Sequence, residues 1–146
     1  MGIKECCEMK VKIRKRVLAL VLAALFLSGS TASASSFDTT VYVGTNQNWS
    51  YSQWVTRTKK WSNCLARCYA VYPPNGGVDN FRYVQTAIFN SVSTQISNTV
   101  VLDEQATSST QVFIYNGYLN LDTVYFKYRG NNPDYDANCH VYGDGL

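Results

Sequence analysis

The sequence predicts an all-β fold, a single antiparallel β-sandwich of about seven to eight short strands that follows a cleaved N-terminal signal peptide. Aromatic residues make up 14% of the chain and charged residues only 16%, well below the ~25% of an ordinary soluble domain. Short runs rich in Val, Ile, Thr, Tyr and Phe alternate with clusters of Asn, Gly, Ser and Asp. This alternation of runs and turns is typical of sandwiches and barrels.

Residues 1–34 have the three parts of a secretory signal. Six of the thirteen Lys and Arg residues lie before Val17, and an apolar run of eleven residues follows at positions 17–27. Ala32-Ser33-Ala34 then supplies the small residues that signal peptidase requires. The apolar run is shorter than the ~20 residues of a membrane-spanning helix, so we expect no stable membrane anchor in the mature form. Residues 35–146 are then one β-sandwich domain.

Met9 is a second candidate for the true start. Lys4-Glu5 can be encoded as AAG-GAG, a bacterial ribosome-binding sequence, and three codons separate it from Met9. On this interpretation residues 1–8 are untranslated and the source is bacterial. The alternative is a slightly longer basic region of the signal peptide.

The mature chain is nearly neutral. Beyond residue 16 the chain has seven Lys and Arg residues and eight Asp and Glu residues, which give a net charge of −1. Such a domain lacks the basic footprint that phosphate backbones require, so no nucleic-acid partner is expected.

Turn residues divide the mature chain into eight runs that we expect to hold the strands. The breakers are Gly44-Thr45-Asn46, the Pro-Pro-Asn-Gly-Gly segment at residues 73–77, Asn116-Gly117 and residues 130–134. Asn-Gly is a strong turn signal because both residues tolerate positive φ. The run at 63–70 also contains good helix formers, and a helix is the alternative there. The expected strand regions are residues 37–43, 49–56, 63–72, 81–89, 91–102, 111–115, 123–129 and 135–142.

Three cysteines remain in the mature chain, in a compartment where thiols tend to oxidise. On a strand, Cys64 and Cys68 lie ~13 Å apart, beyond the ~7 Å that a disulfide spans. The sequence therefore predicts one disulfide that ends at Cys139, and Cys68 is favoured over Cys64 as its partner. A zinc site from these thiols and His140 is disfavoured, because neighbouring residues on a strand point to opposite faces.

Catalytic motifs are missing from the sequence. His140 is the only histidine, and no G-x-S-x-G, H-E-x-x-H or phosphate-binding loop occurs. We therefore predict no catalytic residue and no cofactor. Asn131, Asp134 and Asp136 flank a turn, where local hydrogen bonding explains them, and they are secondary candidates for a calcium site.

Three tryptophans, Trp49, Trp54 and Trp61, fall within thirteen residues. Trp49 shares parity with Tyr51 and Val55, which predicts that Trp49 lies in the core and Trp54 on the opposite, solvated face. Exposed tryptophans stack on sugar rings and anchor protein partners, so Trp54 and Trp61 are the candidate binding residues. The alternative is that these rings only fill the core and its rim.

The expected function is that of a small secreted non-enzymatic module, bacterial and acting outside the cell or at its surface. Its partner would be a glycan, a cell-wall polymer or a protein surface. The alternatives are a secreted antimicrobial or toxin-like effector or inhibitor, and a hydrolase based on the scattered carboxylates.

Cleavage after Ala34 is directly testable. The mature N-terminus should read Ser35-Ser36-Phe37, and mass spectrometry of secreted material measures it. Intact secreted protein that starts at Met1 or Met9 would contradict the prediction.

Overall fold

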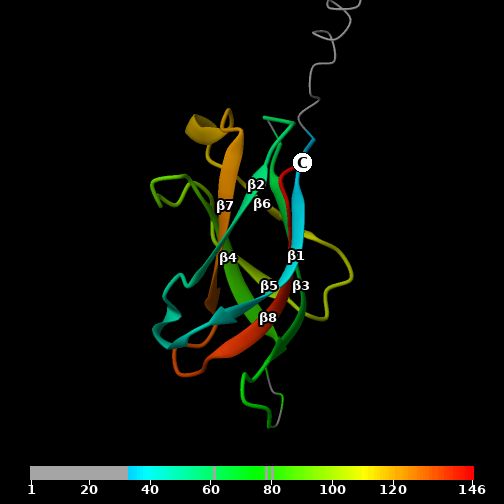
Figure 1. The fold of residues 1–146 in the computed structure, drawn as a ribbon, viewed down its shortest axis with the longest axis vertical. Helices are drawn as coiled ribbons and strands as arrows, with labels where there is room; N and C mark the ends of the chain where they lie inside the picture. The colour runs from blue at the N-terminus through cyan, green and yellow to red at the C-terminus, as the bar shows by residue number, and fades with distance from the viewer. Residues whose placement is uncertain (1–32, 61, 78, 80) are drawn as a thin grey trace, which may run out of the picture. The chain divides into compact units, whose positions relative to one another are not determined.

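The structure, a computed structural model, describes residues 33–60, 62–77, 79 and 81–146. The described chain forms eight strands and two short 3-10 helices (Figure 1). In chain order they are β1 (Ser36–Val43), η1 (Thr45–Gln47), β2 (Tyr51–Thr56), β3 (Cys64–Tyr72), β4 (Tyr83–Phe89), β5 (Val100–Asp103), β6 (Thr110–Val112), η2 (Asn116–Tyr118), β7 (Thr123–Gly130) and β8 (Ala137–Asp144).

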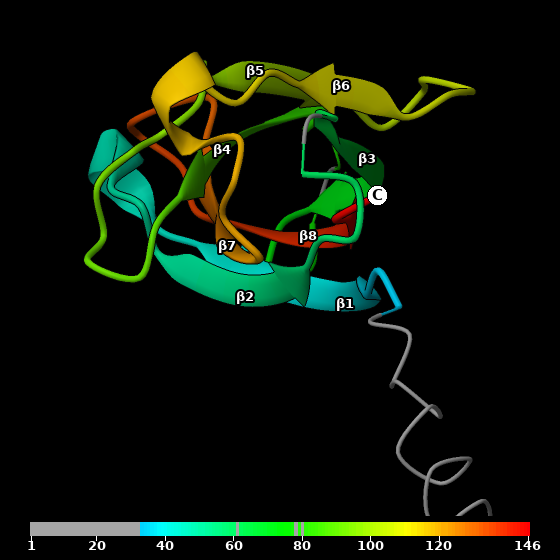
Figure 2. The same cartoon turned by 90° about the horizontal axis from the view of Figure 1, so that it is seen from above.

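The strands form two antiparallel four-stranded sheets, ordered β1-β8-β3-β6 and β2-β7-β4-β5. Figure 2 shows the sheets facing each other, with β1 and β2 at one edge and β5 and β6 at the other. The predicted all-β antiparallel sandwich is confirmed. Among the described residues no helix is long and apolar enough to cross a membrane.

Period-two alternation explains which side chains form the core. In β7, Val124, Phe126 and Tyr128 are fully buried, whereas the residues between them are only half-buried. β8 alternates in the same way, so each sheet turns one face inward. Residues 63–70, for which the sequence allowed a helix, belong to the strand β3 from Cys64 onward. This strand pairs with β6 and β8.

The break between strands at Asn116-Gly117 is confirmed, but it has the form of a 3-10 turn. Neither residue has a positive φ, and they begin η2 instead of a two-residue hairpin. The reason is topological: this connection carries the chain from β6 in one sheet to β7 in the other, so there is no hairpin to close. The Pro-Pro-Asn-Gly-Gly breaker is confirmed as a turn, and both of its glycines, Gly76 and Gly77, have positive φ.

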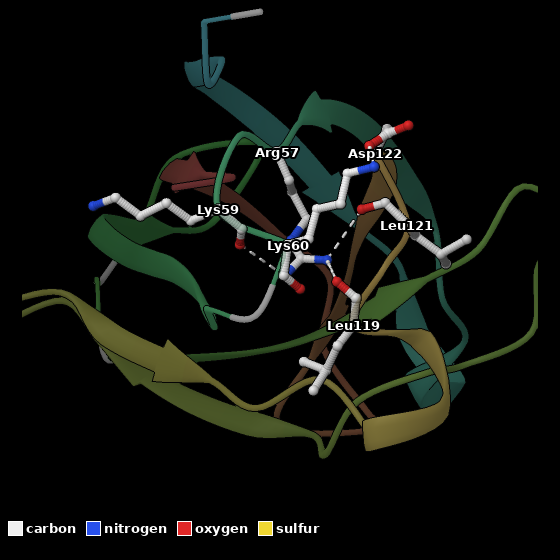
Figure 3. Close-up of polar contacts among 6 residues, drawn as sticks. All are labelled: Arg57, Lys59, Lys60, Leu119, Leu121 and Asp122. Atoms are coloured by element: carbon white, nitrogen blue, oxygen red, sulfur yellow. Dashed lines mark hydrogen bonds and ion pairs between the residues drawn. The ribbon is translucent and has the colours of Figure 1, made fainter.

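Arg57 is a buried cation at the end of β2, with an exposed fraction of 2%. Its guanidinium donates to five backbone carbonyl oxygens from two connections, those of Lys59, Lys60, Ser62, Leu119 and Leu121. Figure 3 shows the guanidinium between these two segments of backbone. The dipoles of the carbonyl groups replace the water that the cation loses on burial.

Replacement of Arg57 by Ala should lower the free energy of unfolding by about 3 kcal/mol or more, because buried carbonyl groups lose their donors. The matched control is Lys60→Ala, which removes an exposed ion pair to Asp122 (Nζ–Oδ1 2.9 Å) and should cost less than about 1 kcal/mol. Urea unfolding of both variants measures the difference. Equal stability of the two would contradict the role given to Arg57.

Candidate functional site

The outer side of the β2-β7-β4-β5 sheet carries a row of aromatic side chains. Trp54 on β2 pairs with Tyr125 on β7, and Tyr125 pairs in turn with Phe89 on β4. Trp54 is 56% exposed, whereas its neighbour Val55 is fully buried. The predicted exposure of Trp54 to solvent is therefore confirmed. Its role in binding stays a prediction.

Trp49 was expected in the core, and this expectation is wrong. β2 begins at Tyr51, so the strand alternation does not extend back to Trp49. Its ring instead meets Phe89 edge-on, with 5.2 Å between the ring centres. Phe89 pairs with Tyr125 on the outer side of the sheet yet is only 4% exposed, and the contact with Trp49 helps to cover it.

Two cations lie against these rings. The Lys127 ammonium is 4.7 Å from the centre of the Phe89 ring, and the Arg129 guanidinium carbon is 4.6 Å from the centre of a Trp49 ring. Both distances suit cation–π attraction, which holds the charges at the sheet surface. We call this surface the aromatic–cationic face; it consists of Trp49, Trp54, Phe89, Tyr125, Lys127 and Arg129.

The charge of this face is of one sign. β2, β4 and β7 contain no Asp or Glu, so no carboxylate on these three strands compensates Lys127 and Arg129. The outer side of the other sheet is different. There, His140 Nε2 contacts Asp38 Oδ1 at 2.5 Å, and the Tyr142 hydroxyl donates to Asp144. That side also carries Arg67, which lies 4.8 Å from the centre of the Tyr69 ring, but there the cation shares the surface with carboxylates. The surface of β2, β7 and β4 is therefore the better match for an anionic ligand.

The remaining carboxylates are mostly engaged in structural contacts. Arg82 donates twice to Asp103 and thereby lowers the pKa of that carboxyl. Glu104 accepts the backbone N–H of Val71. The Tyr42 hydroxyl donates to Asp136 at 2.6 Å, which raises the pKa of Tyr42.

The calcium candidates take part in turn contacts. The Asn131 side-chain oxygen accepts from Gln85, and the backbone N–H of Asp134 donates to Asn132. In the part of the chain that the structure describes, no three or more His, Cys, Asp or Glu residues form a group that could hold a metal ion. Trp61, the other candidate binding residue, lies outside the described residues.

The three cysteines are buried free thiols, so the predicted Cys68–Cys139 disulfide is not formed in this structure. Cys68 stands opposite Val141 on β8, two residues from Cys139. Such diagonal neighbours are typically ~7–8 Å apart, slightly beyond the ~7 Å limit for a disulfide. Cys64 is much farther along the sheet, since it pairs with Val112 on β6. Cys68–Cys139 stays the prediction for the oxidised protein, and it requires a small shift of β3 against β8.

Burial makes these thiols unreactive. It raises the pKa of Cys64 to about 11 and that of Cys68 to about 12, and it also raises the pKa of Cys139. Little thiolate exists at neutral pH, and the thiolate is the reactive form. His140, the neighbour of Cys139, points to the outer face, as the alternation of β8 predicted.

A thiol count tests the cysteine assignment. The folded domain of residues 35–146 should react slowly with an alkylating reagent at neutral pH, because the raised pKa values keep free thiols protonated. After unfolding without a reductant we expect one reactive thiol per chain, Cys64, and after reduction three. Three thiols without a reductant would show that the disulfide is not formed, and a mapped Cys64–Cys68 peptide would contradict the extended β3.

Comparison with protein-family models, with curated proteins and with solved structures found no match to this chain.

Proposed function

We propose that this chain is a small exported, non-enzymatic β-sandwich that binds an anionic extracellular polysaccharide, such as a cell-wall or surface glycan, through the aromatic–cationic face. The observation that carries the proposal is the position of Trp54. It is a largely exposed indole in register with Tyr125, on the part of the sheet formed by β2, β7 and β4, where the charged side chains are Lys127 and Arg129.

Both parts of the face match this class of ligand. The C–H face of a sugar ring packs against an exposed aromatic ring, as Trp54 offers. Acidic groups on the polymer are attracted to Lys127 and Arg129, whose positions are held by the rings of Phe89 and Trp49. A sheet surface is broad and open, which suits an extended polymer better than a small molecule.

The start of the fold supports export. Ser35, the first residue of the proposed mature chain, donates its backbone N–H to Thr56 and accepts the N–H of Gly145. The Ser35 hydroxyl oxygen also accepts the backbone N–H of Thr56. Cleavage after Ala34 would therefore keep every one of these contacts.

The test compares Trp54→Ala with Phe113→Ala, which removes an aromatic side chain of almost equal exposure outside the face. Binding of polygalacturonate, an acidic polysaccharide, is measured by affinity electrophoresis or calorimetry. We expect Trp54→Ala to weaken binding at least about tenfold, which corresponds to 1.4 kcal/mol, and Phe113→Ala to leave it unchanged. Both variants should keep the melting temperature, since exposed substitutions cost within about 0.5 kcal/mol.

Lys127→Ala tests the charge. It should weaken binding mainly at low ionic strength, because salt shortens the Debye length from ~30 Å at ~0.01 M to ~3 Å at ~1 M. Equal affinity of the wild type, Trp54→Ala and Lys127→Ala at all salt concentrations would contradict the proposal. So would equal binding of a neutral polysaccharide.

A further inference from the structure

A separate pocket opens at the end of the sandwich where β7 leads into β8. Its volume is about 410 Å³, within the ~300–1,000 Å³ of typical small-molecule sites. The floor is apolar and belongs to the core: Val43 ends β1 there, Val71 lies one residue before the end of β3, and Ala137 begins β8. None of the side chains of the aromatic–cationic face lines it.

The walls of the pocket carry three aromatic rings. Phe81 and Tyr135 come from different connections and meet with 5.9 Å between their ring centres. Tyr135 is 56% exposed, and Tyr83 is also exposed. These rings therefore offer apolar surface that a flat, ring-shaped ligand would cover.

The pocket is electrically balanced. Among the described residues that line it, Arg82 is the only charged one, and its guanidinium donates to both oxygens of Asp103 at 2.8 and 2.7 Å. This bidentate pair compensates the charge of Arg82 within the protein itself. The lining thus favours a neutral ligand over an acidic one, in contrast to the sheet face.

The polar lip of the pocket offers donors. Arg129 Nε can only donate, so the side-chain oxygen of Gln85 accepts this hydrogen bond. The amide nitrogen of Gln85 then donates to the side-chain oxygen of Asn131. The Asn131 side-chain oxygen is thereby occupied, and its NH₂ group is the part left for a ligand. Asn132 is oriented in the same way, because its oxygen accepts the backbone N–H of Asp134.

We propose that this pocket binds a neutral saccharide unit, independently of the sheet face. Such a ligand has a flat apolar side for Tyr135 and Phe81. It also has hydroxyl or acetamido oxygens that accept from the amide groups of Asn131 and Asn132, and it carries no charge. A plain aromatic molecule would form no hydrogen bond with either amide group.

The probe is N-acetylglucosamine, with glucuronate as its charged counterpart, and the readout is amide chemical-shift mapping of the purified protein. We expect saturable shifts at Asn131, Asn132 and Tyr135 with a dissociation constant on the order of 1 mM, and glucuronate at least about tenfold weaker. The shifts should not extend to β2.

Two variants and one control test the contacts. Asn132→Asp keeps an oxygen for the N–H of Asp134 but removes the amide donor, and Tyr135→Ala removes the ring. Each should weaken binding at least about tenfold. The control is Tyr115→Ala, which removes a similarly exposed tyrosine outside the pocket, just before η2. This variant should bind N-acetylglucosamine as the wild type does.

Absence of shifts at the pocket, wild-type affinity in both variants, or equal binding of glucuronate would overturn the proposal. Shifts confined to Trp54 and Tyr125 would also overturn it while supporting the sheet-face function. Shifts at the pocket without any binding of polygalacturonate would support the saccharide pocket and contradict the sheet-face function.

Discussion

The register between β2 and β7 depends on the buried cation at the end of β2. The Arg57 side chain binds carbonyl groups of two connections that lead from one sheet to the other, β2–β3 and β6–β7 (Figure 3). Its own backbone N–H donates to Asp122, the residue just before β7. Together these bonds fix β2 against β7. A slip of one residue would turn Trp54 inward and Val55 outward, so the aromatic–cationic face requires this register.

The two proposed sites differ in charge but share one chain of hydrogen bonds. Arg129, which lies over Trp49 on the sheet face, donates to Gln85, and Gln85 donates to Asn131 at the pocket. The sheet face presents uncompensated cations, whereas the pocket holds Arg82 neutralised by Asp103. An acidic polysaccharide with neutral sugar units would offer ligands to both sites.

Much of the fold could be predicted from the sequence because breakers and alternation are local signals. The alternation of β7, the strand character of β3 and the exposure of Trp54 all depend on neighbours along one strand.

The features that the sequence did not predict depend on contacts between distant segments. Asn116-Gly117 looks like a hairpin, but the chain changes sheets there. Trp49 precedes its strand and folds onto Phe89. Arg57 is buried where carbonyl groups of its own connection meet those of the distant β6–β7 connection. The pocket, too, exists only once strand ends from both sheets meet.

The most direct measurement of the central claim is amide chemical-shift mapping with short acidic oligogalacturonates. The account predicts that the shifted amides cluster on β2, β7 and the end of β4, around Trp54, Tyr125 and Phe89, and that the shifts diminish as salt is added. Shifts that cluster on β1, β8 and β3, around Asp38 and His140, would contradict it, as would a spectrum that does not change.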